Sequence, residues 1–391
     1  MNLLIISSAC IVDVNRKPYK ILSSYENINL TLLIPFRKGE VDSHNGISDI
    51  ENSDFKIILS EIDGVHPRLE KIRNLKEIIE KAKPDAILLE FDIATMMMYE
   101  TIKFSKKFNS NISFIALENF NRNFLKEMLL AIRNFKLKQD AGTFITYLLY
   151  KQNKKNIDIV YCVSDDGIKA MKYLGFNSSQ IIKIPLGIDT DLFFPYNQDK
   201  INELRKNHDL NKITIAYFGR IIPEKGLDNL IIALNNIRDL DWLLLLDNFS
   251  SYKSDYFTTL KDLIEKFQLQ DRIKYFDANH SEMPHYINCS DIVVLPSKTT
   301  NKFKEQYGRV VAEALCCGKI VLVSNSGALP ELLGDVGFVF EKENIEDLTK
   351  KLKFLLNNYF SIKNDLFPRI IERGVQKLSA KTQASIIYNN I

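Results

Sequence analysis

Short apolar runs alternate with amphipathic segments along most of this chain, and this alternation constrains the fold more than any other feature. Runs rich in Ile, Leu and Val predict buried strands, and apolar positions three and four apart, as in residues 69–79, predict helices. Alternating strands and helices form parallel sheets that helices cover on both faces. The predicted strands are residues 3–7, 30–34, 55–59, 86–90, 112–117 and 159–163, then 213–218, 242–246, 273–276, 292–295, 320–323 and 337–340.

The alternation is interrupted once, near residues 183–189, where a proline and a glycine follow a strand and a polar stretch comes soon after. A chain of 391 residues is also too long for one ordinary core. We therefore predict an α/β protein with two Rossmann-like domains, in residues 1–187 and 188–370. The pattern of the last residues predicts a terminal helix, in a segment 371–391, that packs back towards the first domain.

Composition and charge exclude several classes of protein. The net charge of +3, from 52 basic and 49 acidic residues, gives no field suited to a nucleic-acid backbone. No apolar stretch reaches the length needed to cross a bilayer, and the first apolar run is too short for a signal peptide. An odd number of cysteines without paired metal-ligand spacing indicates reduced thiols and a cytoplasmic location. These cysteines are Cys10, Cys162, Cys289, Cys316 and Cys317.

The strongest local signal is the segment Tyr217–Gly226, which leads from the first strand of the second domain into a helix. Arg220 and Lys225 bracket this strand-to-helix turn, where free amides and a helix dipole favour an anion such as phosphate. Gly219 allows a close approach of the backbone. The alternative is that both cations are solvated loop residues.

A second signal is the pair Glu305 and Glu313, eight positions apart at the start of an apolar helix. If the helix ran through both, they would share one face. Glu305 precedes Gly308, however, which places it in the loop that feeds the helix. The pair either addresses a ligand or forms a solvated ion-pairing face. The polar loop 324–331 either lines the same site or is a simple turn.

At these residues the chain resembles family 4 of the retaining glycosyltransferases, whose fold is GT-B. The resemblance covers the second domain and consists of motifs in the same order as in the family. They are Ile184–Asp189, Gly219–Arg220 with Glu224–Gly226, Leu295–Ser297, Glu305–Glu313, and Ser326–Gly327 with Pro330–Glu331.

The resemblance implies two domains that face each other across a cleft and a nucleotide diphosphate sugar as donor substrate. Transfer would retain the anomeric configuration, with no cofactor and no metal. The residues implied as catalytic are Arg220 and Lys225, which would hold the diphosphate, and Glu305, which would contact the donor sugar. Those implied in donor binding are Gly219, Gln306, Tyr307, Gly308, Arg309 and Glu313, the last on the nucleotide ribose.

The first domain departs from the family in two places on the acceptor side. Residues 7–16 replace a glycine-rich loop, so side chains such as Asn15 and Arg16 must shape that wall. Residues 117–123 lack the histidine that many relatives place after a later strand, and Asn119 is the predicted substitute contact.

Residues 122–155 are rich in lysine and arginine, with apolar residues interleaved at helical spacing. They form either a peripheral contact with anionic lipid or a crossover helix with a solvated basic face. The acceptor implied by the resemblance is a glycan or a lipid-linked molecule. Two alternatives to a transferase are a GT-B nucleotide-sugar epimerase and a non-catalytic nucleotide-sugar-binding protein.

Overall fold

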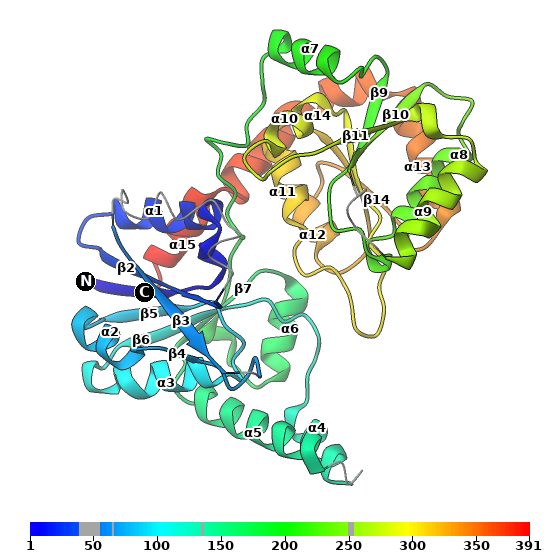
Figure 1. Cartoon of the computed structure of the whole chain (residues 1–391). Helices are drawn as coiled ribbons and strands as arrows, with labels where there is room; N and C mark the ends of the chain where they lie inside the picture. The colour runs from blue at the N-terminus through cyan, green and yellow to red at the C-terminus, as the bar shows by residue number, and fades with distance from the viewer. Residues whose placement is uncertain (39–54, 65, 134–136, 249–253) are drawn as a thin grey trace. The chain divides into compact units, whose positions relative to one another are not determined.

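A computed structural model describes residues 1–38, 55–64, 66–133, 137–248 and 254–391 (Figure 1). The chain divides into two compact units. Unit 1 consists of Met1–Gly187 with Ala380–Ile391, and unit 2 is Ile188–Ser379. Each unit holds a mainly parallel sheet with helices packed against it, so the predicted α/β class and the two Rossmann-like folds are confirmed.

The described part of unit 1 forms an eight-stranded sheet in the order β4-β3-β2-β1-β5-β6-β7-β8. All neighbours are parallel except β3 and β4. The strands are β1 (Asn2–Ile6), β2 (Asn29–Phe36), β3 (Lys56–Asp63), β4 (Lys71–Ile72), β5 (Ala86–Leu89), β6 (Asn111–Ala116), β7 (Ile159–Cys162) and β8 (Ile181–Lys183). The helices are α1 (Lys17–Ser23), α2 (Leu75–Ala82), α3 (Met96–Ser105), α4 (Phe124–Arg133), α5 (Leu137–Lys154) and α6 (Asp165–Tyr173).

The helix expected over residues 69–79 is shorter than the apolar spacing predicted. Ile72 pairs with Ile62 across the antiparallel β3–β4 contact and is buried there. Asn74 then takes a left-handed conformation with φ 53°, and α2 begins at Leu75. Edge-strand pairing buries Ile72, the second apolar position of this segment, so the helix starts later.

Unit 2 contains a parallel six-stranded sheet in the order β11-β10-β9-β12-β13-β14. The strands are β9 (Ile213–Tyr217), β10 (Trp242–Asp247), β11 (Ile273–Phe276), β12 (Ile292–Leu295), β13 (Ile320–Ser324) and β14 (Phe338–Phe340). The helices are α7 (Gln198–Asn207), α8 (Leu227–Asn235), α9 (Asp255–Lys266), α10 (Met283–Cys289), α11 (Arg309–Cys316), α12 (Leu329–Leu333), α13 (Ile345–Asn357) and α14 (Tyr359–Lys377).

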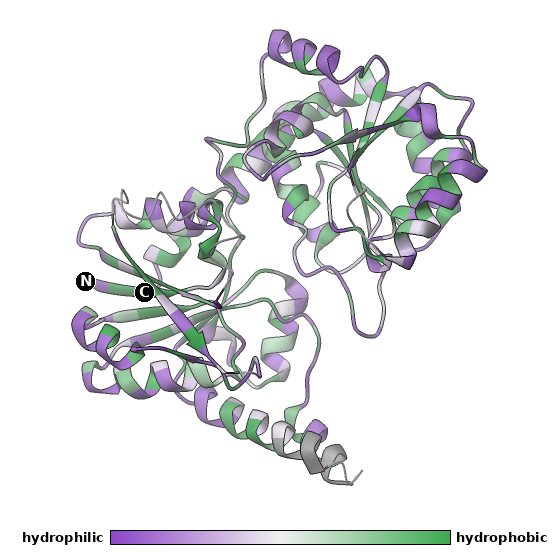
Figure 2. Cartoon of the chain, viewed as in Figure 1, coloured by the Kyte–Doolittle hydropathy of each residue, from purple (hydrophilic) through white to green (hydrophobic). Residues whose placement is uncertain are grey.

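Apolar strands and the inner faces of helices form the core of each unit. In unit 2, Trp242 of β10 is fully buried in a cluster with Leu230 of α8 and Leu352 of α13. In unit 1, the corresponding cluster joins β1, β5 and β6 to α2 and α3. Figure 2 shows the consequence, with hydrophobic strands inside and hydrophilic residues on the outer helix faces.

The predicted terminal segment 371–391 is not one helix. Helix α14 ends at Lys377, and α15 (Ala380–Tyr388) is a separate helix of unit 1. It packs against α1, with the rings of Tyr25 and Tyr388 4.7 Å apart, and Gln383 Oε1 accepts a hydrogen bond of 2.7 Å from the Gly187 amide.

The basic segment 122–155 forms two helices, α4 and α5, that pack together. Residues 134–136 and the side chains of residues 130–141 lie outside the described part of the chain. Among the helices that are described, none combines the length and the apolar character that a bilayer crossing requires.

Candidate functional site

The candidate donor residues of unit 2 gather where strands of its sheet end. Strand β9 ends at Tyr217, and the exposed Gly219 and Arg220 follow it. The 3-10 turn η6 (Pro223–Lys225) then leads into α8. Tyr217 fixes this turn, because its buried hydroxyl donates a 2.8 Å hydrogen bond to the Arg220 carbonyl. The Arg220 guanidinium forms no ion pair within the described residues, so it is available to an anion.

Lys225 and Glu305, 80 positions apart in the chain, meet at this edge of the sheet. The Lys225 ammonium lies 2.6 Å from Glu305 Oε2, and the two side chains are only 15% and 9% exposed. Ser297, which follows β12, donates a 2.8 Å hydrogen bond to the same oxygen. The structure thus brings together two of the three residues predicted as catalytic.

Two glycines make the close approach of these loops possible. Gly226 has a φ of +69°, and a side chain there would place its Cβ 2.1 Å from the Pro296 carbonyl oxygen. Gly327 has a φ of +53°, and its Cβ would lie 2.0 Å from the Glu305 carbonyl oxygen. Any larger residue would push apart the loops that hold Lys225 and Glu305.

The loop 324–331 lies against Glu305, which supports the first of its two interpretations. Ser326 Oγ accepts a 3.4 Å hydrogen bond from the Glu305 amide and donates one of 2.9 Å to the Lys298 carbonyl. The Ala328 amide donates a 3.0 Å bond to the Glu305 carbonyl. This loop therefore positions the backbone on both sides of the carboxylate.

Helix α11 begins after Glu305, as predicted. Gly308 is its N-cap residue, with a left-handed φ of 83° that a residue with a side chain rarely adopts. Two predicted donor contacts lie between Glu305 and Gly308: Gln306 is exposed and Tyr307 is buried. Since α11 starts at Arg309, the free amides of its first turn come directly after the loop that carries Glu305.

Glu313 lies on the second turn of α11 and is almost fully buried, with its side chain 5% exposed. Burial raises the pKa of its carboxyl, and the Arg309 guanidinium, whose Nε lies 3.1 Å from Glu313 Oε1, opposes that rise. His280 Nε2 is 4.0 Å from the same oxygen. A buried carboxylate of this kind is stabilised by hydroxyl donors such as those of a ribose.

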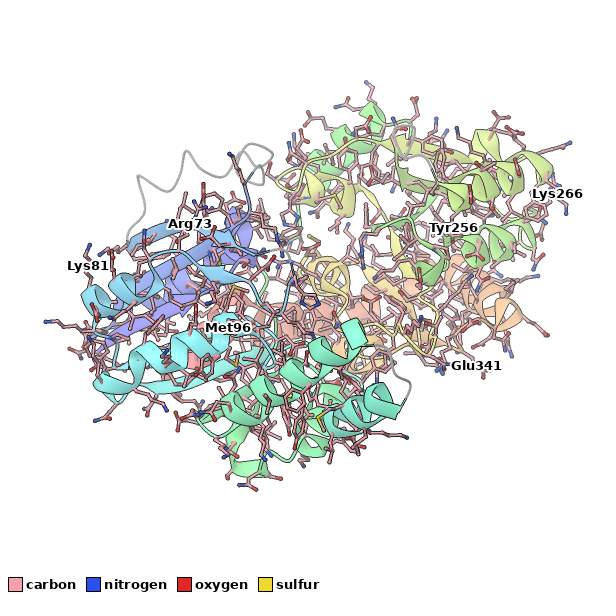
Figure 3. All side chains as sticks on the ribbon, turned by 60° about the horizontal axis from the view of Figure 1, so that its bottom comes forward. Arg73, Lys81, Met96, Tyr256, Lys266 and Glu341 are labelled. Carbon is pink, nitrogen blue, oxygen red and sulfur yellow. The ribbon has the colours of Figure 1, made fainter. Side chains whose placement is uncertain are left out.

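A second polar network supports the start of α8, and sequence reasoning did not find it. Asp228 accepts a 2.7 Å hydrogen bond from the Tyr256 hydroxyl, and Tyr256 is labelled in Figure 3. The Lys298 ammonium is 2.7 Å from the other Asp228 oxygen. The network has no local sequence signal, because Asp228 lies on α8, Tyr256 on α9 and Lys298 in the loop after β12.

The predicted acceptor residues Asn15 and Arg16 lie in unit 1 and hold the loop after β1. The buried Arg16 guanidinium donates to the carbonyls of Cys10 at 2.7 Å and Ile11 at 3.0 Å. Asn15 donates through its amide to the Ala9 carbonyl at 2.7 Å. Both residues shape the loop, and their contact with an acceptor stays a prediction.

Glu90 is a polar residue of unit 1 that the predicted site lacks. It follows β5, and its carboxylate accepts hydrogen bonds from Ser7, which follows β1, and from the Tyr19 hydroxyl. Asn119, after β6, is 3% exposed. Ser7, Glu90 and Asn119 thus all follow parallel strands of one sheet. The sequence signal that could have identified Glu90 is a glutamate directly after an apolar run.

The arrangement in unit 2 provides cations and backbone amides for an anion, with carboxylates nearby for hydroxyl groups. Within the described ranges, no three His, Cys, Asp or Glu side chains come together in a way that could hold a metal ion.

Comparisons with known proteins place these features in context. Residues 199–374 match the family model described as Glycosyl transferases group 1. The chain is 25% identical over 208 residues, 52% of its length, to the GPI3 subunit of phosphatidylinositol N-acetylglucosaminyltransferase from Saccharomyces cerevisiae. That match covers 43% of the yeast protein, so the chain spans less than half the length of this curated relative.

Solved structures resemble the whole chain. A glycosyltransferase from Rickettsia africae superimposes with a TM-score of 0.75 at 17% identity, over 99% of this chain and 96% of that one. HepE from Anabaena, in complex with UDP and glucose, gives a TM-score of 0.71 at 17% identity, over 100% and 98%. At this identity the likeness shows the fold, which is GT-B.

Proposed function

We propose that the chain transfers a sugar from a nucleotide diphosphate donor to a glycan or lipid-linked acceptor. The match of residues 199–374 to the family model of the group 1 glycosyl transferases supports this proposal. The observation that carries the proposal is the buried contact of Lys225 with Glu305, beside the exposed Arg220. This contact supports the proposal, because a cation that can bind a diphosphate lies beside a carboxylate that can bind sugar hydroxyls.

Each side chain has a defined task in the proposed reaction. When the bond between the sugar and the diphosphate breaks, negative charge grows on the departing oxygen, and Arg220 and Lys225 stabilise it. The ammonium of Lys225 has three donors, so it binds phosphate while keeping its contact with Glu305. Glu305 orients the donor sugar, and Glu313 accepts from the ribose. The acceptor oxygen attacks from the face that the diphosphate leaves, which retains the configuration, and no metal takes part.

Donor binding tests the proposal first. Thermal unfolding is measured with UDP, GDP, ADP and dTDP sugars for the wild type and for Arg220→Ala and Glu305→Gln. Arg238→Ala is a matched control, since Arg238 is an exposed arginine of unit 2 beyond the far end of α8. One donor should stabilise the wild type and Arg238→Ala, and this stabilisation should disappear in Arg220→Ala.

Product analysis then separates a transferase from its alternatives. NMR of the product formed with the identified donor, in the presence of EDTA, should show an acceptor glycoside with the anomeric configuration of the donor. Release of an epimerised sugar would indicate an epimerase, and donor binding without any product across an acceptor panel would indicate a sensor. A folded protein that no nucleotide sugar stabilises would refute the donor site itself.

We also propose that α4 and α5 rest on anionic lipid at the cytoplasmic face of a membrane. Leu125 and Leu129 lie one turn apart on α4 and are 46% and 54% exposed, and Phe144 and Leu148 of α5 are each 46% exposed. Exposed lysines such as Lys126 accompany them. Apolar side chains flanked by lysine are typical of helices that bind a lipid surface.

Liposome sedimentation tests this contact. Vesicles with phosphatidylglycerol should bind the wild type and bind Leu125→Glu/Leu129→Glu much less, whereas neutral vesicles should bind neither. Equal sedimentation of the wild type and the variant would show that these helices form a solvated surface.

A further inference from the structure

A pocket of about 330 Å³ lies in unit 2 at the edge of the sheet opposite to the candidate donor residues. Asp291 directly precedes β12 and Lys319 directly precedes β13, so the pocket is at the amino ends of these strands. Glu305 and Arg220 follow the carboxyl ends of strands instead. The remaining polar and aromatic walls include Tyr196, Asn288, Tyr359 and Lys363.

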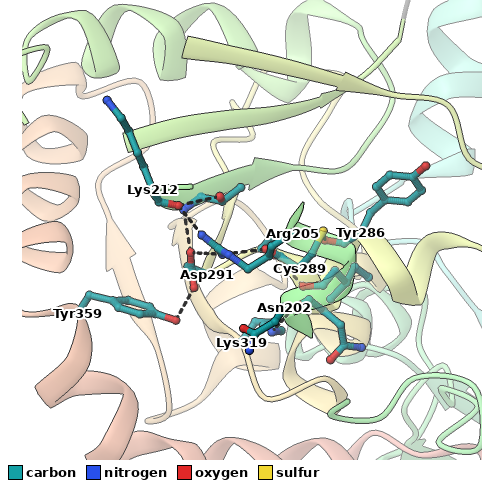
Figure 4. Close-up of polar contacts among 12 residues, drawn as sticks. Asn202, Arg205, Lys212, Tyr286, Cys289, Asp291, Lys319 and Tyr359 are labelled. Carbon is teal, nitrogen blue, oxygen red and sulfur yellow. Dashed lines mark hydrogen bonds and ion pairs between the residues drawn. The ribbon is translucent and has the colours of Figure 1, made fainter. Parts of the chain in front are cut away.

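Asp291, the one carboxylate among the lining residues, is already neutralised by Arg205. Arg205 Nη1 lies 2.8 Å from Asp291 Oδ2, which also accepts a 2.8 Å bond from the Thr214 amide. The Tyr359 hydroxyl donates a 2.7 Å bond to Asp291 Oδ1. Figure 4 shows these contacts converging on the carboxylate. Asp291 therefore has little capacity left to balance further positive charge.

Two ammonium groups on the pocket wall have no carboxylate of their own among the described residues. Lys319 Nζ donates a 2.6 Å hydrogen bond to a neutral group, the Asn288 carbonyl. Lys363 Nζ lies 5.8 Å from the centroid of the Tyr359 ring. The lining thus carries an excess of positive charge, which an anion in the pocket would balance.

The electrostatics of Lys319 agree with this geometry. Burial lowers the pKa of its ammonium to about 8, and Lys363 contributes to the decrease, whereas Asp291, Cys317 and Cys289 oppose it. The lowered pKa means that the charged form of Lys319 is less stable in the folded protein than it is in water. A bound anion would stabilise the charged form.

The rest of the lining suits an organic body attached to the anion. Tyr196, Tyr359 and Phe367 supply aromatic surface, with Pro195 and Ile201 beside them. The volume is at the lower end of the range typical of small-molecule sites. The walls come from four segments of unit 2, which are residues 195–201, 288–291, 317–320 and 359–368.

We propose that this pocket is a second ligand site, which binds a small organic phosphate through Lys319 and Lys363, with its organic body against the aromatic wall. Lysine binds phosphate as a point charge, and two lysines fix one phosphate from two sides. The site shares no residue with the candidate donor site.

Isothermal titration calorimetry with phenyl phosphate tests the proposal, with inorganic phosphate and phenol as the two partial ligands. Phenyl phosphate should bind more tightly than inorganic phosphate, and phenol should not bind. Lys363→Ala and Lys319→Met should each weaken binding about tenfold or more, the loss expected for one charge-assisted contact. Lys353→Ala, which removes an exposed lysine of α13, should leave affinity unchanged.

Arg220→Ala distinguishes the two sites. If phenyl phosphate affinity falls in Arg220→Ala and persists in Lys363→Ala, the probe occupies the donor site and the second site is refuted, while the proposed function stands. Absence of binding at about 10 mM probe also refutes it, because such an affinity is too weak for a site of this kind. Equal affinity for phosphate and phenyl phosphate contradicts the role of the aromatic wall. Lys319→Met removes a partner of the Asn288 carbonyl, so this variant can unfold for a structural reason. In that case Lys363→Ala tests the site instead, because Lys363 is a partly exposed residue of α14.

Discussion

Replacing Lys225 by methionine should destabilise unit 2 strongly, even though Lys225 lies in a surface loop. The variant removes the ammonium 2.6 Å from Glu305 and leaves a carboxylate that is 9% exposed. The neutral hydroxyl of Ser297 still donates to it, but this contact supplies no positive charge. Loss of the cation next to a buried carboxylate lowers the free energy of unfolding.

The size of the effect follows from the distance and the burial. At 2.6 Å the Coulomb attraction of the pair is about 6 kcal/mol at an effective dielectric constant of about 20. Desolvation of both groups offsets part of it, and loss of one partner of a buried pair typically costs about 3–5 kcal/mol. Since water still reaches 15% of Lys225, we expect about 3 kcal/mol for Lys225→Met.

The single tryptophan makes the measurement selective for unit 2. Trp242 is fully buried in β10, so its fluorescence during urea unfolding reports on that unit. A double-mutant cycle with Glu305→Gln should recover at least half of the loss, because the double variant has lost both charges of the pair. Lys212→Met is the matched control: Lys212 pairs with Asp241 at 2.9 Å, but that carboxylate is 83% exposed, so the cost should stay below about 1 kcal/mol.

Two results would refute this reasoning. A loss for Lys225→Met no larger than that for Lys212→Met would mean that solvent compensates Glu305. Strict additivity of Lys225→Met and Glu305→Gln would mean that the two groups are not coupled in solution.

Three further outcomes are expected. Gly327→Ala should lower stability by about 3 kcal/mol, because the residue has a positive φ and its Cβ would lie 2.0 Å from a backbone oxygen. Gly142→Ala, at a position in open space on α5, should raise stability by about 0.5–1 kcal/mol, and thermal unfolding followed by circular dichroism measures both variants. Burial lowers the pKa of Lys319 in the folded protein to about 8, so above that pH the unfolded chain binds more protons than the folded one and stability rises with pH. Relative to Lys319→Met, the free energy of unfolding of the wild type should therefore increase by about 2 kcal/mol up to a pH of about 9.5, as measured in urea titrations. All five thiols are buried, so a thiol reagent should modify none of them in the folded protein at neutral pH, and rapid modification of any would show local opening.

The sequence predicts the repeating parts of the fold well, because burial in a parallel sheet leaves a strong local pattern. The strands at residues 273–276 and 292–295 have the predicted bounds. Strand β4 could not be predicted, since two residues carry no periodicity and their pairing depends on β3. The break between α14 and α15 was missed for a similar reason, because it depends on packing against α1 rather than on a helix-breaking residue.

The candidate site also has parts that the sequence predicts and parts that it does not. A motif that runs along one segment, such as Gly219–Gly226, shows by its residue order alone that its cations lie on a strand-to-helix turn. Contacts that join separate segments, such as Ser297 with Glu305 or Glu90 with Tyr19, depend on which strands are neighbours in the sheet. The roles of Arg220, Glu305 and Glu313 towards a donor stay predictions.

The return of α15 to unit 1 affects the order in which the protein is completed during synthesis. Unit 2 is one continuous stretch, whereas unit 1 needs residues 380–391 after the whole of unit 2 has been made. On the ribosome the first unit to emerge is therefore the last to be completed, and the surface of α1 that α15 covers stays exposed until the end of synthesis. We expect a chain stopped after Ser379 to keep a folded unit 2 and to expose α1 to proteolysis, and adding the missing helix as a peptide should restore protection.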